Sequence, residues 1–333
     1  MIQLKYLYLI FIVVCITSCS KKNEITTGKL NPSFGSRNHI TVVIEDDLWN
    51  GEVGDSIRKR LAQTGFGLDK DEPIFDLDQY SPEIFSTKAK TSRNIVVFSN
   101  SDDYLFTLEK SFYATPQNLF FVRANSNKEL IQNFNTHADS IISVFRKSEL
   151  NEEQHALVRK ELLDTDIVKE FFACTIKIPK TFQLVLEHDN FLWFQKDLPT
   201  GNSNLVIYEV PISSIENSKD DIEDNLIKVQ DSISKLFIQG SNENSYLITE
   251  TGFFPSFKPI RIQEFSGYEI SGTWEMENDF MSGPFLNIAL KDSYYDRYLI
   301  FQAFVNYPYK SKRDLLFEME GIIKTVNFYN NEN

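Results

Sequence analysis

The sequence predicts an α+β fold of two closely packed halves, with antiparallel sheets that carry helices on one face. Segments with alternating apolar residues lie next to one another in the chain, and segments with helical spacing are grouped between them, which is the pattern of an α+β fold. No linker rich in Gly and Ser separates the halves, so we expect them to pack against each other. We place the first α+β domain at residues 39–168 and the second at residues 169–329.

Strand and helix patterns are mixed in the first half. Apolar residues at helical spacing predict a helix near residues 54–64. Ser126-Asn127-Lys128-Glu129 is a capping box, so it predicts the start of a longer helix. A further helix is expected from Asn151 towards Phe172. Strands are expected at residues 39–45, 94–99, 104–113 and 118–124.

The second half is rich in strands. In residues 268–276 apolar and polar side chains alternate almost perfectly, with Tyr268, Ile270, Trp274 and Met276 on the apolar face. This alternation is typical of an antiparallel strand with one solvent-exposed face. The other segments expected to form strands are residues 175–178, 182–187, 191–195, 204–210, 285–290 and 298–305.

Two amphipathic helices complete this half. Ser218 and Asp221 provide capping side chains for the first, and Ser311 and Asp314 provide them for the second. The residues expected to point inward are Ile222, Leu226, Val229, Ile233 and Leu236 in the first helix, and Leu315, Met319, Ile322 and Val326 in the second.

The composition is that of an acidic globular protein. The formal net charge is −13 and the pI is about 4.9, which argues against a nucleic-acid partner because such binding needs a basic face. Cys15 and Cys19 lie near the N-terminus, which leaves Cys174 as the thiol of the folded part, so no intramolecular disulfide is expected. Cys174 lies in an apolar run, which favours a buried and unreactive thiol.

The N-terminus has the organisation of an export signal. Lys5 precedes an uncharged apolar run, residues 6–16, that is too short to span a bilayer. Ile16-Thr17-Ser18-Cys19 resembles the bacterial lipobox. The resemblance implies that residues 1–18 are a signal peptide and that Cys19 carries a diacylglyceryl group and an amide-linked acyl chain such as palmitate.

The residues after the lipobox indicate where the anchor is delivered. Ser20 follows Cys19, and by resemblance to known sorting rules this residue favours the outer membrane over the inner one. Lys21 and Lys22 come next instead of an acidic run, so we expect the protein to face the periplasm. Residues 19–38 are polar and read as a flexible tether between the lipid and the fold.

The sequence carries no recognisable catalytic, metal or cofactor motif. We therefore predict no catalytic residue, no metal site and no cofactor. The densest polar group surrounds Trp49, where Glu52 and Asp55 join a short acidic run at residues 45–47. We single out Trp49, Glu52 and Asp55 as a ligand-binding or structural loop, because carboxylates near a helix start can either hold a cation or stabilise the helix.

Several motifs resemble a known family, the domain of unknown function 4837. They are Leu48 to Arg58, Ser92-Arg93-Asn94, Gly272-Thr273-Trp274-Glu275, Ser282-Gly283-Pro284-Phe285 and Lys312-Arg313-Asp314. The resemblance implies an envelope lipoprotein of Gram-negative bacteria, and it implies no catalytic residues because the family has no known activity. The second half also resembles PsbP/Mog1-like domains in its order of hairpins and helices.

These observations predict a lipid-anchored envelope protein that binds or scaffolds an unknown protein or small ligand without catalysing a reaction. Its membrane contact is expected through the lipid on Cys19. Two alternatives stay open: an envelope enzyme of unrecognised type, and a surface lipoprotein that binds glycans.

Overall fold

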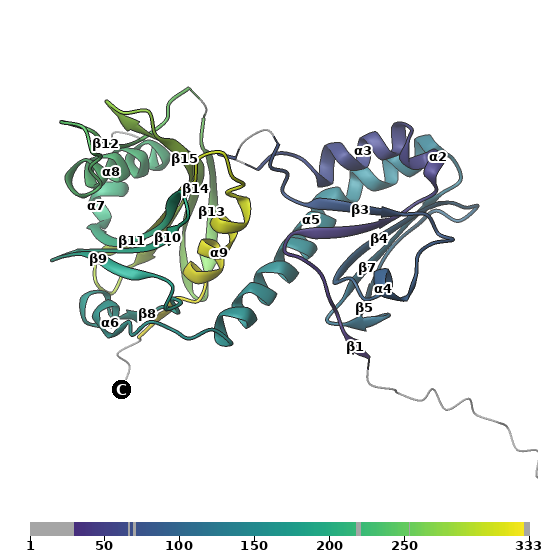
Figure 1. Cartoon of the computed structure of the whole chain (residues 1–333), viewed down its shortest axis with the longest axis horizontal. Coiled ribbons are helices and arrows are strands. Elements are labelled where there is room, and N and C mark those ends of the chain that lie inside the picture. Colours follow the sequence, from purple (N-terminus) through teal and green to yellow (C-terminus); the bar gives the residue numbers. More distant parts are fainter. Residues whose placement is uncertain (1–29, 66, 69–70, 218–220, 253, 330–333) are drawn as a thin grey trace, which may run out of the picture.

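The computed structural model describes residues 30–65, 67–68, 71–217, 221–252 and 254–329. These residues form two lobes joined by one long helix, α5 (Asn127–Val158) (Figure 1). Among the described helices, none combines the length and the apolar character needed to cross a bilayer. The predicted signal peptide and Cys19 lie outside the described residues.

The first lobe is a five-stranded sheet in the order β3-β2-β4-β7-β5. Four neighbouring strands are parallel, and only the edge strand β5 runs antiparallel to its neighbour. The strands are β2 (His39–Val43), β3 (Asp76–Tyr80), β4 (Asn94–Asn100), β5 (Leu105–Lys110) and β7 (Asn118–Ala124), with a small parallel pair formed by β1 (Asn31–Pro32) and β6 (Ala114–Thr115).

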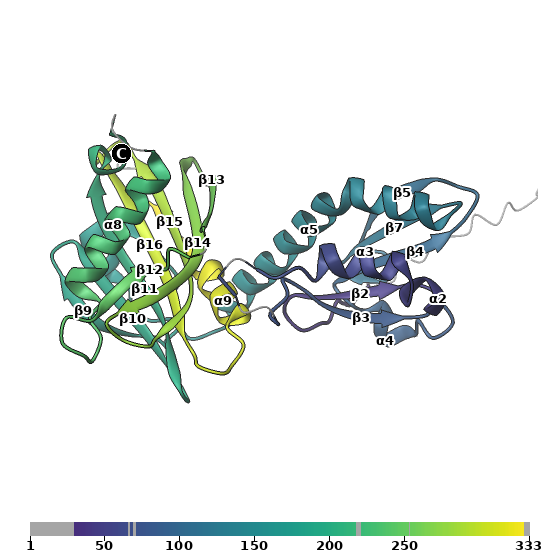
Figure 2. The ribbon, with the colours of Figure 1, turned by 90° about the horizontal axis from the view of Figure 1, so that it is seen from above.

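Helices α3 (Glu52–Leu61) and α5 pack on one face of this sheet, where Ile57, Phe98 and Phe134 belong to one apolar core. The short α2 (Asp46–Trp49) precedes α3, and α4 (Thr87–Lys90) lies on the side of the sheet opposite α5 (Figure 2). The α+β class is therefore confirmed, but the antiparallel sheet expected in this half is wrong. The helical connection from β2 to β3 returns the chain in the same direction, which makes the pair parallel.

The second lobe contains an eight-stranded sheet that is antiparallel throughout, as expected. The strand order is β12-β14-β15-β16-β11-β10-β9, and β13 pairs with β14. The strands are β9 (Gln183–His188), β10 (Phe191–Leu198), β11 (Gly201–Pro211), β12 (Tyr246–Thr249), β13 (Ser256–Ile262), β14 (Phe265–Glu277), β15 (Ser282–Asp292) and β16 (Arg297–Asn306).

Helices cover both faces of this second sheet, whereas the sequence predicted them on one face. Figure 2 shows α8 (Ile222–Phe237) on one side of the strands and α9 (Arg313–Ile323) on the other. β15 and β16 are buried at nearly every position, which is why both faces need cover. The smaller elements are α6 (Asp166–Phe172), α7 (Ile212–Ile215) and the antiparallel pair of β8 (Cys174–Thr175) with β17 (Asn327–Phe328).

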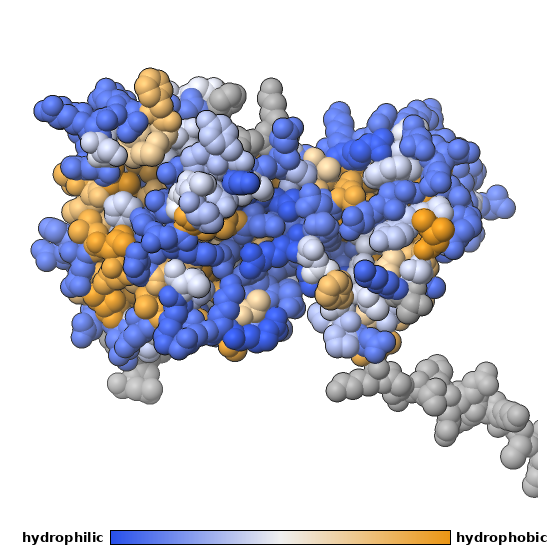
Figure 3. Space-filling model, in the orientation of Figure 1, coloured by the Kyte–Doolittle hydropathy of each residue, from blue (hydrophilic) through white to orange (hydrophobic). Residues whose placement is uncertain are grey.

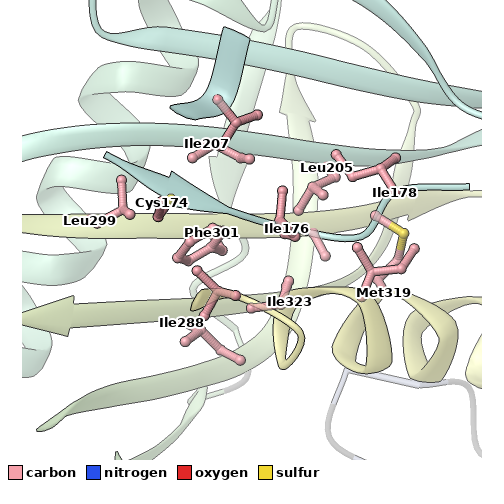
Figure 4. Close-up of a cluster of buried hydrophobic side chains, with 14 of the residues drawn as sticks. Cys174, Ile176, Ile178, Leu205, Ile207, Ile288, Leu299, Phe301, Met319 and Ile323 are labelled. Atoms are coloured by element: carbon pink, nitrogen blue, oxygen red, sulfur yellow. The ribbon is translucent and has the colours of Figure 1, made fainter. Parts of the chain in front are cut away.

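The core under α9 holds the thiol of Cys174. Figure 4 shows Cys174 among Ile176, Phe301 and Met319, which all belong to one buried apolar cluster. Burial raises the pKa of the Cys174 thiol to about 12, so the thiol stays protonated at neutral pH. The expectation that Cys174 is a buried free thiol is confirmed.

Two helix predictions need correction. The helix expected from Asn151 does not begin there, because α5 continues through that position to Val158 and α6 is a separate helix. In α8 the predicted inward residue Leu236 is 64% exposed, while Gln230 and Ser234 are buried. The sheet opposite α8 supplies polar partners, so Gln230 accepts a hydrogen bond from the amide of Asn287 over 2.8 Å.

The two lobes meet where α9 packs against α5. A carboxylate from the first lobe, Glu72, accepts hydrogen bonds from the backbone amides of Lys312 and Arg313 at the start of α9, over 2.6 and 2.8 Å. At the other end of α9, the amide of Gln154 donates to the carbonyl of Lys324 over 3.0 Å. Both ends of the helix are therefore capped by groups that α5 or the first lobe supplies.

Between these caps, buried carboxylates form ion pairs across the contact. Glu318 is 4% exposed and lies 2.7 Å from both Lys160 and Lys196. Glu320 is buried with Arg146 and Lys324. Burial alone would raise the pKa of Glu318, but the hydrogen bonds and charges of the two lysines outweigh it and hold the pKa below its ordinary value.

This pairing predicts a dependence of stability on pH. Because the pKa of Glu318 is lower in the folded state than the ordinary 4.5, its pairing stabilises the fold above about pH 4.5 and the effect is lost as the pH falls further. We expect Glu318→Gln to reduce the free energy of unfolding by about 2 kcal/mol at neutral pH. The difference from the unmodified protein should shrink in acid.

Urea unfolding at neutral pH and at about pH 3.5 measures the loss of unfolding free energy in Glu318→Gln and the decrease of this loss in acid. The exposed Glu52→Gln is the matched control, and it should leave the curve unchanged at neutral pH. A Glu318→Gln protein as stable as the control would show that the pairs of Glu318 with Lys160, just after α5, and with Lys196, in β10, do not stabilise the fold.

Candidate functional site

The predicted loop around Trp49 is a closely packed corner between α2 and α3. The guanidinium of Arg58 lies 4.5 Å from the centre of the Trp49 ring and donates to the Trp49 carbonyl over 3.1 Å. The same guanidinium pairs with Asp55 over 2.7 Å. The structure therefore brings Trp49 and Asp55 together through Arg58, while Glu52 lies exposed in the first turn of α3.

Gly54 explains why the corner is so tight. A Cβ at this position would overlap the carbonyl oxygen of Trp49, so only glycine lets α3 approach α2 this closely. The side chains of the preceding acidic run are exposed, and that of Asp46 accepts a hydrogen bond from the amide of Gln79 over 2.9 Å. Among the described residues no group of three His, Cys, Asp or Glu side chains is placed to hold a metal ion. These contacts favour the structural interpretation of the Trp49 loop over the ligand-binding one.

The candidate site is a groove in the second lobe, next to the first. It has a volume of about 800 Å³ and is bounded by the middle of β14, the start of β15, the end of β16 and part of the first lobe. Three aromatic side chains, Phe254, Phe280 and Tyr309, line it and are almost fully exposed. We call this site the aromatic groove, and its other lining residues are Gly65, Gly67, Leu68, Gly252, Gly272, Thr273, Met281, Ser282, Gly283, Pro284, Asn306, Pro308 and Lys312.

Turns with unusual backbone angles present two of the aromatic side chains. Phe280 follows the turn at Asn278, which has a φ of 59°, and its amide is fixed by Asp279 over 2.7 Å. Tyr309 itself has a φ of 60°, which is uncommon for a residue with a side chain. Such conformations persist where the surrounding structure imposes them, and they are frequent at functional sites.

Glycines allow the first lobe to form one wall of the groove. Gly67 has a φ of 73° and lies so close to Gly272 in β14 that a Cβ would overlap the carbonyl oxygen of Gly272. On the floor, Gly283 lies beside the buried Trp274, and the Trp274 indole donates to the carbonyl of Val305 over 3.3 Å. The motif residues around 272–275 and 282–285 thus shape the groove.

The aromatic groove contains few groups able to perform chemistry. Among its described lining residues, Lys312 carries an ionisable amine, which lies 3.7 Å from the Glu72 carboxylate. Its polar groups are otherwise hydroxyls and the amide of Asn306, and this lining includes no carboxylate and no imidazole. The groove can therefore offer apolar surface and a few hydrogen bonds, and it presents no general base.

Reasoning from the sequence did not find this site. The aromatic side chains lie in turns beside Gly, Asn and Pro, where a large exposed ring has no packing role. Aromatic residues placed in turn segments were the available signal, but only the fold shows that three such turns meet.

The Trp49 corner leads to a prediction on stability. We expect Gly54→Ala to lower the free energy of unfolding by about 2 kcal/mol or more, because the added methyl group forces α2 and α3 apart. Urea unfolding measures the loss. Glu52→Ala, at an exposed position two residues away, should change it by less than about 0.5 kcal/mol. Equal stability of the two variants would contradict the structural interpretation.

Comparisons with known proteins give a family but no activity. No match was found among curated protein sequences. Two solved structures align with part of the chain: the Ran-binding protein Mog1p of Saccharomyces cerevisiae, with 7% identity over 46% of this chain and 89% of that one, and a point mutant of Mog1, with 9% identity over 48% and 92%. Both have a TM-score of 0.32.

Two family models divide the chain between them. Residues 33–158 match a domain of unknown function (DUF8532), and residues 161–325 match a domain of unknown function (DUF4837). The motifs at residues 48–58 and 92–94, which resemble the second family, lie in the part matched by the first. The motifs that line the aromatic groove lie within residues 161–325, and this part of the chain belongs to the DUF4837 family.

Proposed function

We propose that this protein is a lipid-anchored envelope protein that binds a partner in the aromatic groove and catalyses no reaction. The observation that carries the proposal is the exposure of Phe254, Phe280 and Tyr309 around one cavity. Water contact with large apolar rings is unfavourable, and clustered exposed rings are typical of interaction sites. Aromatic side chains also contribute a large share of the energy at protein interfaces.

The position of the aromatic groove supports binding. Ligand sites occur preferentially where two domains meet, because the concave surface there buries more of the ligand. In this protein Gly65, Gly67 and Leu68 of the first lobe face β14 and β15 of the second across the groove. A partner in the groove would contact both lobes.

The chemistry of the lining favours an apolar or aromatic segment of a protein partner. The rings supply contact area at little cost in conformational freedom, and Asn306 and Lys312 can fix the orientation of a polar backbone. A glycan-binding role remains the alternative, since sugars also stack on exposed rings. The enzyme alternative has less support, because the described lining lacks the base that proton transfer would need.

The anchor is the second part of the proposal. Leu30, the first described residue, is at the surface, and β1 is exposed, so the described chain starts at the surface of the first lobe. A tether from Cys19 would hold the protein at the periplasmic side of the outer membrane. Stable anchoring takes two lipid chains, and lipobox processing would attach three.

A test of the anchor uses Cys19. Replacement by Ser should abolish incorporation of radiolabelled palmitate and release the protein from the membrane fraction, because the thiol that accepts the lipid is gone. Cys174→Ser is the matched control and should retain both label and membrane association, since this thiol is buried in the fold. Palmitate in the Cys19→Ser protein would contradict the lipobox interpretation.

A test of the groove uses a photoreactive side chain in cells. With p-benzoylphenylalanine at position 280, we expect a crosslinked adduct with one envelope protein, identified by mass spectrometry. The adduct should be lost when Phe254 and Tyr309 are both changed to Ser, because the partner then loses its apolar contacts. The control places the same side chain at Leu236, which is exposed on α8 away from the groove.

The outcomes separate the candidate functions. Adducts of equal yield at positions 280 and 236 would show random encounters and contradict a site in the groove. An adduct with polysaccharide instead of protein would favour the glycan-binding alternative.

A further inference from the structure

In the described part of the chain, long helices cover only one face of the sheet of the first lobe. The register places Ile95, Val97, Leu119 and Phe121 on the face away from α5. On this face the cover consists of α4, the segment before it that carries Phe85, and the loop before β6. Under this cover Ile95 and Leu119 are buried, while Val97 and Phe121 are only partly buried. We call this surface the open face of the first lobe.

A mostly parallel sheet normally has both faces covered, because its strands are apolar on both sides. Here aromatic side chains extend the apolar surface outward. Phe112 is 49% exposed, and its ring centre lies 4.6 Å from that of Tyr113 and 6.4 Å from that of Phe121. Phe34, which bridges to Ser92 at the margin of the open face, is 71% exposed. Figure 3 shows apolar patches among hydrophilic side chains on this side of the lobe.

The path of the chain indicates what covers the open face. β1 pairs with β6, which directly follows Phe112 and Tyr113, so the N-terminal segment enters at the margin of this face. Figure 1 shows β1 and β5 together at the same margin of the lobe. Cys19 and Leu30 are 11 positions apart. Such a tether spans at most about 40 Å and, if flexible, about 18 Å on average.

The side chains around the open face suit a lipid surface. Lys88 is exposed on α4, the ammonium of Lys90 lies 5.4 Å from the centre of the Tyr113 ring, and the guanidinium of Arg123 lies 5.5 Å from that of Phe121. Aromatic rings flanked by Lys and Arg are typical of the membrane interface, where the rings sit at headgroup level and the cations reach the phosphates. Exposed acidic side chains, Glu83 and Glu109, are also present near this face.

The net charge of −13 argues against a strong attraction to anionic lipid, so the open face would orient the anchored protein and would not bind it to the membrane alone. We infer that the open face of the first lobe rests on the headgroups of the bilayer that holds the acyl chains of Cys19. This inference rests on the proposed function, because it needs the lipid anchor.

The test uses the full acylated protein in phosphatidylcholine vesicles that contain brominated lipid, which quenches nearby tryptophan. In Phe112→Trp we expect the added emission to fall about twofold more than in Tyr294→Trp, because only the first ring reaches the headgroup region. Tyr294 is 76% exposed and lines a separate pocket with Tyr329 near the C-terminus, so it is a matched control. The native tryptophans are the same in both proteins, and circular dichroism checks their folding.

A second readout does not depend on replacing an aromatic ring. A water-soluble amine reagent should label Lys88 several-fold more slowly in vesicles than in the Cys19→Ser protein in solution, while exposed Lys169 keeps its rate. Changing both Phe34 and Phe112 to Ser should restore the labelling of Lys88, because the face then no longer rests on the lipid.

The possible outcomes distinguish a missing anchor, a missing contact with the bilayer and a contact with a second copy of the chain. Absence of palmitate would contradict the anchor of the proposed function and this inference with it. An acylated protein with equal quenching at positions 112 and 294 would contradict this inference alone. Slow labelling of Lys88 without vesicles, together with the mass of a dimer, would assign the open face to a second copy of the chain.

Discussion

The placement of the two lobes depends on charged groups buried where α9 meets α5. Glu153, Glu318 and Glu320 are each no more than 4% exposed, and each is paired with Arg or Lys. Burying a carboxylate is costly, and removing one partner leaves a charge that water cannot reach. Such a contact tolerates only the arrangement in which every charge is matched, so it defines the orientation of the lobes more sharply than an apolar contact would.

The approach of the helices shows how closely this contact is built. Gly321 in α9 faces Glu153 in α5, and a Cβ at Gly321 would lie 2.7 Å from the Glu153 side chain. Arg93 and Asn94 donate hydrogen bonds to the neighbouring Glu149 of α5 within the first lobe. A buried glutamate therefore fixes α5 to its own sheet, and buried glutamates also fix α9 to α5. One continuous helix therefore carries the geometry of one lobe to the other.

Both proposed surfaces follow from this arrangement. The aromatic groove has one wall from the first lobe, so it exists only while Gly67 stays against Gly272. The open face belongs to the first lobe alone, where α5 occupies one side of the sheet and leaves the other side thinly covered. A rigid connection through α5 would hold the groove at a defined position relative to a membrane that the open face contacts.

The sequence by itself determined those elements whose signals are local. The helix start predicted at Ser126 is confirmed, since the Ser126 side chain caps α5 by accepting from the amide of Glu129, and the alternating residues 268–276 form part of β14. Contacts between distant residues decided the rest. β3 has no apolar alternation and is a strand because β2 lies beside it, and the groove exists because three turns meet. Backbone propensity and periodicity act over a few residues, whereas strand direction, buried ion pairs and grooves depend on which segments meet in space.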